Sequence, residues 1–268
     1  MNEVPDTAGL LAACVEAARA AGDHAHRDIH RRGEVVQRSA HDVKLKLDQE
    51  CQAKAEEVIR GAFPQHAILG EEGGAYVNSD EPLWIIDPID GTVNFMHGLP
   101  LWCSSVAVRV GGRVVAGAVY LPVLRECFKA RCEEPATLNG EPIRVSEVRS
   151  LGDAVVLTGL SKHIGKDAVT LSTFEAISLK AQKTRLMGAA AVDICSVACG
   201  RADGYFESTI QLWDVAAAAL IVAQAGGKAE VLEQLDPIRM RVLCSNGLIH
   251  EELKAVVLPS FSAAPRKA

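Results

Sequence analysis

Acidic side chains stand at three points where an apolar run meets a loop. Glu71 and Glu72 follow the run "AILG", and Asp87 and Asp90 end the run "LWIIDPID". Asp214 begins a third apolar stretch, "WDVAAAALIV". Carboxylates that share a cleft repel each other unless a cation lies among them, and Mg²⁺ prefers oxygen ligands and commonly shares its shell with substrate phosphate. The pattern therefore predicts a magnesium site that handles a phosphate group.

The segment "DPIDGTVNF" has the backbone features of a combined metal and phosphate site. Pro88 disfavours helix at Asp87 and holds it extended, so the Ile89 carbonyl and the two carboxylates can face one point. Gly91 permits close approach of the backbone, and Thr92 begins a segment that can open a helix. Free N–H groups at a helix start, together with the helix dipole, favour an anion. In outline this is a metal-assisted phosphatase.

Each of these acids also has an ordinary structural interpretation. Asp214 alone is typical of a helix N-cap, and Glu71 or Glu72 alone is typical of a solvated loop. Asp87 before a proline is common in turns. The metal hypothesis depends on the conjunction of all three acidic junctions with the glycine-containing turn.

Several long motifs resemble those of the inositol monophosphatase family. They are "GEE" followed by "WIIDPIDGTVNF" and, far downstream, "WDVAAAALIVAQAGG". The intervening "GAAAVDICSVACGRADGYFE" is similar to bacterial members, and the resemblance extends from about residue 10 to 257. It implies the layered αβαβα sandwich that this family shares with fructose bisphosphatases, and a Mg²⁺-dependent, lithium-sensitive phosphatase.

The resemblance implies two metal positions. Glu71, Asp87 and the Ile89 carbonyl would bind the first Mg²⁺ ion. Asp87, Asp90 and Asp214 would bind the second, which gives Asp90 a part in catalysis.

A third metal position of the family matches Asp48. The family segment before it has a threonine-containing middle, but "HDVKLKLDQ" keeps Asp42 and Asp48 and has Lys44, Leu45 and Lys46 between them. The resemblance therefore implies two or three Mg²⁺ ions. The lysines would either weaken the third site or add positive charge near the phosphate, and they are also compatible with an exposed strand face.

The family roles of the other matching residues concern water, phosphate and substrate. Glu71 and Thr92 would orient the nucleophilic water, and the N–H groups of Gly91 and Thr92 would hold the phosphate. Glu207 matches a position that contacts a substrate hydroxyl, and Ala190 would line the same pocket.

The elements that must position these residues can be read from periodicity. Helical spacing of apolar residues predicts helices over 7–30, with Thr7 as N-cap, and over 48–63, ending at Gly61. Strand-like runs follow, folded at Gly111-Gly112 and at Asn139-Gly140, and predict an antiparallel sheet. Strands and helices alternate from about residue 150 onward, which is typical of an α/β unit. We expect an N-terminal α+β subdomain at 1–147 and a C-terminal α/β subdomain at 148–268 that completes the active site.

Composition restricts the class of protein. The 268 residues are 49% hydrophobic and 23% charged, with a formal net charge of −6, which suits a soluble globular protein and disfavours nucleic-acid binding. No run approaches the ~20 apolar residues of a membrane span, and the N-terminus does not read as a secretory signal. Eight scattered cysteines without a C-x-x-C pair indicate packed, reduced thiols. We expect a cytoplasmic protein without membrane or nucleic-acid partners, and the family resemblance implies a homodimer.

The phosphate-binding core does not identify the substrate. Inositol monophosphate or a similar polyol phosphate is the first hypothesis. A 3′(2′),5′-bisphosphate nucleotide, histidinol phosphate and fructose 1,6-bisphosphate are the alternatives. Lys162, His163 and Lys166 would suit a nucleotide or bisphosphate, whereas Glu207 suits a hydroxyl or an amine. A protein of this family that works chiefly as a binding partner, for instance of transcription machinery, is a hypothesis of another class.

Overall fold

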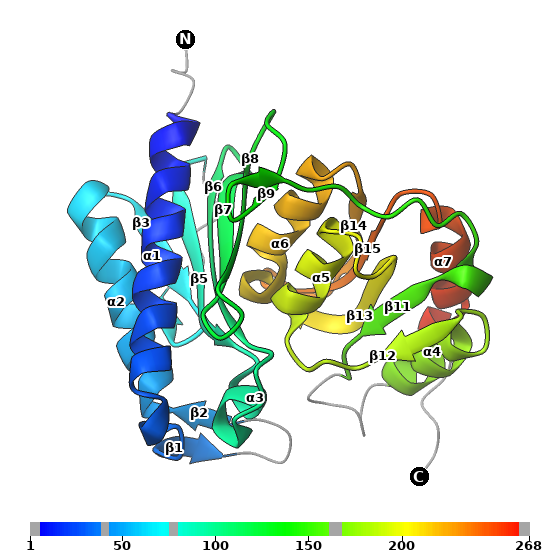
Figure 1. Ribbon diagram of the computed structural model, residues 1–268, viewed down its shortest axis with the longest axis horizontal. Coiled ribbons are helices and arrows are strands. Elements are labelled where there is room, and N and C mark those ends of the chain that lie inside the picture. Colours follow the sequence, from blue (N-terminus) through cyan, green and yellow to red (C-terminus); the bar gives the residue numbers. More distant parts are fainter. Residues whose placement is uncertain (1–5, 39–42, 75–79, 161–167, 263–268) are drawn as a thin grey trace.

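The structure is a computed structural model, and it describes residues 6–38, 43–74, 80–160 and 168–262. Its elements form five layers, in the order helices, sheet, helices, sheet and helices (Figure 1). The layered αβαβα sandwich expected from the sequence is therefore confirmed.

The first layer consists of α1 (Thr7–Arg27) and α2 (Lys46–Ala62), which pack on each other and on the larger sheet. The buried face of α1 is rich in alanine, so the two helices can approach closely. Helix α1 is capped by Asp6, whose carboxylate accepts the N–H of Gly9 at 3.1 Å. The N-cap predicted at Thr7 is wrong by one residue. A 3₁₀ turn at Ile29–Arg31 and a ribbon of β1 (Val35–Arg38) and β2 (Val43–Leu45) connect the two helices.

The larger sheet has eight strands within the described residues, in the order β10-β9-β8-β7-β6-β5-β3-β4. The bounds are β3 (Ala67–Gly70), β4 (Gly73–Gly74), β5 (Leu83–Asp90), β6 (Cys103–Val110), β7 (Arg113–Leu121), β8 (Glu126–Arg131), β9 (Thr137–Leu138) and β10 (Glu141–Pro142). Most neighbours are antiparallel, as predicted, but β3 and β5 pair in parallel. This pairing places the carboxyl ends of both strands, and hence their acidic residues, at the same edge of the sheet.

The two expected hairpin turns are present. Gly111 and Gly112 join β6 to β7 with φ angles of 57° and 76°, the left-handed values that favour glycine in a two-residue turn. Asn139 and Gly140 join β9 to β10 with φ angles of 52° and 94°. In both turns the local residues determine the backbone course.

The middle layer consists of α5 (Ala190–Ala198) and α6 (Leu212–Gln224), which lie between the two sheets (Figure 1). Helix α6 lies so close to β7 that a Cβ atom added to Gly117 would be 2.9 Å from the Cα of Ala217. One apolar core joins residues of the larger sheet with residues of α5, α6 and the second sheet. The proposed division at residue 147 falls between β10 and the second sheet. The two halves share this core, and their division into two subdomains stays a prediction.

The second sheet has the order β12-β11-β13-β15-β14. Its strands are β11 (Val155–Thr158), β12 (Lys183–Arg185), β13 (Gly204–Gln211), β14 (Lys228–Gln234) and β15 (Arg239–Ser245). Strand β11 is parallel to β12 and β13, while β13, β15 and β14 are antiparallel. The outer layer comprises α4 (Ala168–Ser178), α7 (His250–Val257) and the 3₁₀ segment Leu258–Ser262.

Helix α7 is fastened to the second sheet by His250. Its Nδ1 lies 2.8 Å from the Ser245 hydroxyl and its Nε2 lies 2.9 Å from Glu230. A serine, a histidine and a carboxylate joined by hydrogen bonds in this order resemble a nucleophilic triad. Ser245 is completely buried, however, so this cluster is a structural fastening and no substrate reaches it.

The close approach at Gly117 generates a prediction about stability. Gly117→Val should destabilise the protein by about 1–3 kcal/mol, because added methyl groups force α6 away from β7. Urea unfolding followed by circular dichroism measures the change. Gly61→Ala is the matched control: nothing lies within 4 Å of its added Cβ, so it should be neutral or stabilising. An unchanged unfolding midpoint in Gly117→Val would show that α6 and β7 are not in close contact.

Candidate active site

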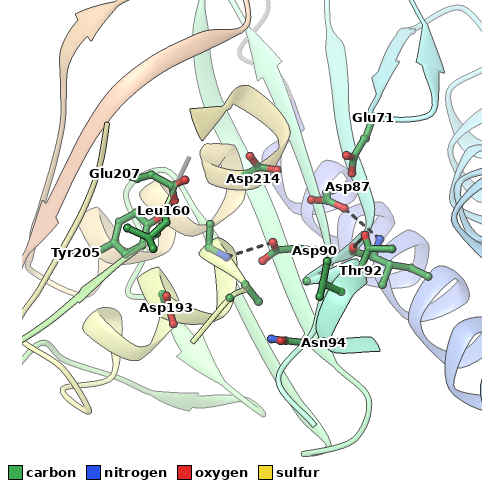
Figure 2. Close-up of a pocket in the computed structure, with 17 residues that line it drawn as sticks. Glu71, Asp87, Asp90, Thr92, Asn94, Leu160, Asp193, Tyr205, Glu207 and Asp214 are labelled. Atoms are coloured by element: carbon green, nitrogen blue, oxygen red, sulfur yellow. Dashed lines mark hydrogen bonds between the residues drawn. The ribbon is translucent and has the colours of Figure 1, made fainter. Parts of the chain in front are cut away.

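The main pocket of the described residues lies where the larger sheet, the middle helices and the second sheet meet. Its wall is built from the turn after β5, the starts of α5 and α6, and strand β13. Figure 2 shows carboxylates from these separate elements around one space. Every residue expected to hold metal, except Asp48, lines this pocket.

Three carboxylates form its centre. Asp87, Asp90 and Asp214 each offer an oxygen within 4.8 Å of the others, although Asp214 lies far along the chain from the first two. Burial raises the pKa of Asp87 well above its usual range, and the charges of Glu71, Asp90 and Asp214 raise it further. Burial also raises the pKa of Asp90, to about 6. Buried like charges this close are costly without a counterion, so a hard divalent cation fits the donor set.

The end of β5 aims its two carboxylates by a break in strand pairing. Asp87 pairs with Ser105 of β6 and Asp90 with Cys103, with an irregular register between them. Proline is tolerated at such a bulge because no ladder hydrogen bond is required of it. The Ser104 hydroxyl donates to the Pro88 carbonyl at 2.6 Å and holds the bulge in place.

Asp214 combines the two roles that its position in the sequence suggested. It lies in the first turn of α6, where its Oδ2 accepts the N–H of Gln211 at 3.0 Å. The same side chain lines the pocket. The capping interpretation and the metal interpretation are compatible.

Asp90 connects the two halves of the protein. Its oxygens accept the backbone N–H groups of Ala190 at 3.2 Å and Ala191 at 2.7 Å, at the start of α5. Beside it, the Asn94 amide donates to the carbonyls of Leu101 at 2.7 Å and Met187 at 2.8 Å. These bonds fix α5, and with it the pocket wall near Ala190, to the turn after β5.

The turn after β5 has the form that a phosphate site needs. Gly91 has a φ angle of 87°, and a Cβ there would be 2.9 Å from the Cβ of Ala189. Helix α3 (Thr92–His97) begins directly after it. The Thr92 hydroxyl donates to the Ile89 carbonyl at 2.9 Å, which ties together two of the predicted site residues.

Glu71 lines the same pocket from the end of β3. Its backbone N–H donates to the Ile86 carbonyl at 3.1 Å, which continues the parallel pairing of β3 and β5. Its carboxylate is not within 4.8 Å of all three central aspartates. Glu71 therefore borders the central cluster from the β3 side (Figure 2).

Asp48 lies apart from this pocket. Its Oδ2 accepts the N–H of Leu45 at 2.6 Å and so caps the start of α2. Its Oδ1 has no hydrogen-bond partner among the described residues, and burial raises its pKa to about 8. Lys44 pairs with Glu72 at 2.9 Å nearby. A third metal role for Asp48 stays a prediction, and Asp42 lies outside the described residues.

The wall opposite Glu71 comes from β13, α5 and the end of β11. Glu207 lies here, and its Oε2 accepts the hydroxyl hydrogen of Tyr205 at 2.5 Å. A Cβ on Gly159 would lie 2.1 Å from the same oxygen, so the carboxylate depends on a glycine there. Sequence reasoning missed Tyr205 and Asp193, both of which line the pocket. Asp193 could have been noticed in the sequence, because it is the single acidic residue within the apolar stretch "AAAVDICSVA".

The sequence pattern that describes the inositol monophosphatase family matches residues 6–265. The chain belongs to this family. The pattern spans both sheets and every predicted site residue, so the family resemblance seen in the motifs extends to the whole fold.

Individual relatives agree with this. An inositol-1-monophosphatase of Synechocystis sp. is 39% identical over 221 residues, which cover 80% of this chain and 76% of the relative. A Nus factor SuhB of Pasteurella multocida is 38% identical over 222 residues, covering 81% and 83%. The solved structure of an inositol monophosphatase from Anabaena (Nostoc) sp. superposes with a TM-score of 0.82 at 34% identity, over 93% of this chain and 95% of that one.

Members of the inositol monophosphatase family are phosphatases and generally depend on a metal ion. The carboxylate cluster in this chain suits that chemistry. None of the helices in the described ranges has the length and apolar character that a bilayer span requires.

The electrostatics of the pocket predict how Mg²⁺ stabilises the protein. A buried acid whose folded pKa is raised contributes stability below its unfolded pKa, and that contribution is lost as pH rises through the folded value. For Asp90 the window runs from 3.8 to about 6. Mg²⁺ should therefore raise the melting temperature more at about pH 7.5 than at about pH 5.5, where protons compete for the carboxylates.

Differential scanning fluorimetry with and without a chelator measures these shifts. Asp214→Asn removes one carboxylate charge and should reduce the shift at the higher pH. Equal shifts at both pH values, or no shift in the wild type, would contradict a cation site among these acids.

Proposed function

We propose that the protein is a Mg²⁺-dependent phosphomonoesterase that hydrolyses inositol monophosphate or a similar small polyol phosphate. The observation that carries this proposal is the convergence of Asp87, Asp90 and Asp214 beside the glycine turn that begins α3. Hydrolysis of a phosphate ester by a metal-activated water uses a carboxylate metal site and a phosphate-binding turn side by side.

The residues of the chain divide the work as follows. Mg²⁺ bound among the carboxylates would neutralise phosphate charge and lower the pKa of water. Thr92 donates its hydroxyl hydrogen to Ile89, so its oxygen retains lone pairs that can accept a hydrogen bond from the attacking water. Glu71 would orient the same water from the β3 side. The N–H groups of Gly91 and Thr92 would hold the phosphate.

The pocket favours an alcohol with further hydroxyl groups over a bisphosphate. Its described lining residues include no lysine, arginine or histidine, whereas Glu207 and Asp193 line the wall away from the central aspartates. A second phosphate would meet the Glu207 carboxylate there, while a hydroxyl or an amine could donate to it. Lys162, His163 and Lys166, on which a nucleotide hypothesis depended, lie outside the described residues. Histidinol phosphate, which carries an amine, is the nearest alternative.

A role as a binding partner is the second candidate function. Its support is the similarity to relatives that bear the name Nus factor SuhB. The complete set of pocket carboxylates supports hydrolysis as the main role, and the formal net charge of −6 disfavours direct contact with nucleic acid. The family resemblance further supports a homodimer, and a cytoplasmic location stays a prediction from the sequence.

Removal of one central carboxylate tests the metal mechanism. Asp90→Asn should reduce Mg²⁺-dependent phosphate release at least about 10³-fold, because a misplaced cation no longer stabilises the transition state. The substitution leaves one of the two α5 N–H groups without its acceptor, but it also relieves repulsion among the close carboxylates, so the net loss of stability should be small. Phosphate release from inositol 1-phosphate, with Mg²⁺, with chelator and with millimolar Li⁺, measures the effect.

The wild type should be inactive in chelator and inhibited by Li⁺. Asp153→Asn changes an exposed aspartate far from the pocket lining and serves as control. Retention of more than about a tenth of the wild-type rate in Asp90→Asn would remove Asp90 from the metal site.

Glu207 should determine substrate choice. Its carboxylate would form a charged hydrogen bond to a substrate hydroxyl, worth about 1.5–3 kcal/mol. Glu207→Gln should therefore lower kcat/KM for inositol 1-phosphate roughly 10–100-fold and leave p-nitrophenyl phosphate, which has no such hydroxyl, almost unaffected. Steady-state kinetics of wild type and Glu207→Gln on both esters measures the effect. Equal losses on the two esters would place Glu207 in the metal or phosphate machinery, and no loss on either would leave it without a part in substrate choice.

A further inference from the structure

Asp193 is a buried acid that the fold itself leaves without a partner. It lies in the first half of α5 and is only 2% exposed, yet its Oδ1 has no hydrogen bond within the described residues. Its helix neighbours Val192 and Ile194 are buried and apolar. An unsatisfied buried polar group costs stability, so a residue of this kind requires an explanation.

A structural aspartate in the same protein looks different. Asp203 is also buried, at 6% exposed, but its oxygens accept hydrogen bonds from the Ser146 hydroxyl at 2.5 Å and the Val155 N–H at 2.7 Å. It lies outside the pocket lining and connects the segment before β13 to β11. The fold can therefore satisfy a buried aspartate where it needs one, and at Asp193 it does not.

The position of Asp193 indicates what could satisfy it. Asp193 lines the main pocket together with Tyr205 and Glu207, and Figure 2 shows these three gathered on one side, with Asp87 and Glu71 on the other. Tyr205 gives its hydroxyl hydrogen to Glu207, so it has none left for Asp193. Burial, with the charges of Asp90 and Glu207 adding to it, raises the pKa of Asp193 to about 9. At neutral pH its side chain is therefore a hydrogen-bond donor as well as an acceptor.

We propose that Asp193 is a second hydroxyl-binding residue of the pocket, beside Glu207, for the alcohol part of a polyol phosphate. This inference rests on the proposed function and extends it to a residue outside the metal and phosphate machinery. The Glu207 carboxylate can only accept hydrogen bonds, whereas Asp193 can donate one and accept another. Two substrate hydroxyls, or one hydroxyl that both donates and accepts, satisfy this pair, and a phosphate ester without further hydroxyls does not.

Three variants test the proposal. Asp193→Leu keeps the branched outline of the side chain, with methyl groups in place of the oxygens, and removes its hydrogen bonding, so KM for inositol 1-phosphate should rise about tenfold with kcat changed less than about twofold. Kinetics on p-nitrophenyl phosphate should be unchanged. Asp193→Asn retains a donor and an acceptor and should stay within about threefold of the wild type on both esters.

Thermal stability distinguishes substrate binding from a structural role. Asp193→Leu should melt at the wild-type temperature or higher, because it removes an unsatisfied buried acid. The matched control Asp203→Leu leaves Ser146 and Val155 without their acceptor and should melt at a lower temperature, with no change in preference between the two esters.

The outcomes separate this inference from the proposed function. Equal KM values for Asp193→Leu and wild type on inositol 1-phosphate, or a lower melting temperature with parallel losses on both esters, would overturn it. If the wild type hydrolyses no phosphate ester, the proposed function fails, and calorimetric titration of inositol 1-phosphate into the Mg²⁺-loaded protein decides the inference. Weaker binding by Asp193→Leu then supports it, and equal or absent binding overturns it.

Discussion

The mutual repulsion of three closely placed carboxylates, two of them buried, is the constraint on which the site depends. Asp87, Asp90 and Asp214 would separate in a flexible chain, so each must be held by a rigid element. The bulged end of β5 holds the first two, and the first turn of α6 holds the third. Close packing of α6 on β7, where Gly117 leaves room for Ala217, brings them together. The stability of the fold supplies the energy that concentrates this charge.

The same constraint explains why both halves of the chain are needed. Asp90 accepts two N–H groups from α5, so one carboxylate serves the cation site and also anchors the wall that carries Ala190 and Asp193. Strand β13 adds a contact of its own to this wall, because the Tyr205 hydroxyl donates to Glu207 beside Gly159. Under the proposed function, metal chemistry and substrate choice would be carried by different residues of one pocket, so substrate preference could change while the central carboxylates stay the same.

Features that depend on neighbouring residues could be predicted from the sequence, and features that depend on contacts between distant segments could not. The left-handed turn at Gly111-Gly112 and the glycine turn that follows Asp90 were predictable because neighbouring residues determine them. The parallel pairing of β3 and β5 was not, since it depends on contacts between separate segments. The cap of α1 was misplaced by one residue because aspartate and threonine are both good caps. Asp193 was overlooked because its meaning depends on which residues face it across the pocket.

The helices of the middle layer come late in the chain, and this has a consequence for the protein during its synthesis. The larger sheet is made of residues 67–142, but the helix that covers its inner face, α6, ends only at Gln224. A ribosome adds about 5–20 residues each second, so that apolar face waits several seconds for its cover. During this interval the nascent chain exposes alanine- and valine-rich strands, which makes it a client for chaperones that bind emerging hydrophobic surface. Truncation before α6 would make this transient exposure permanent.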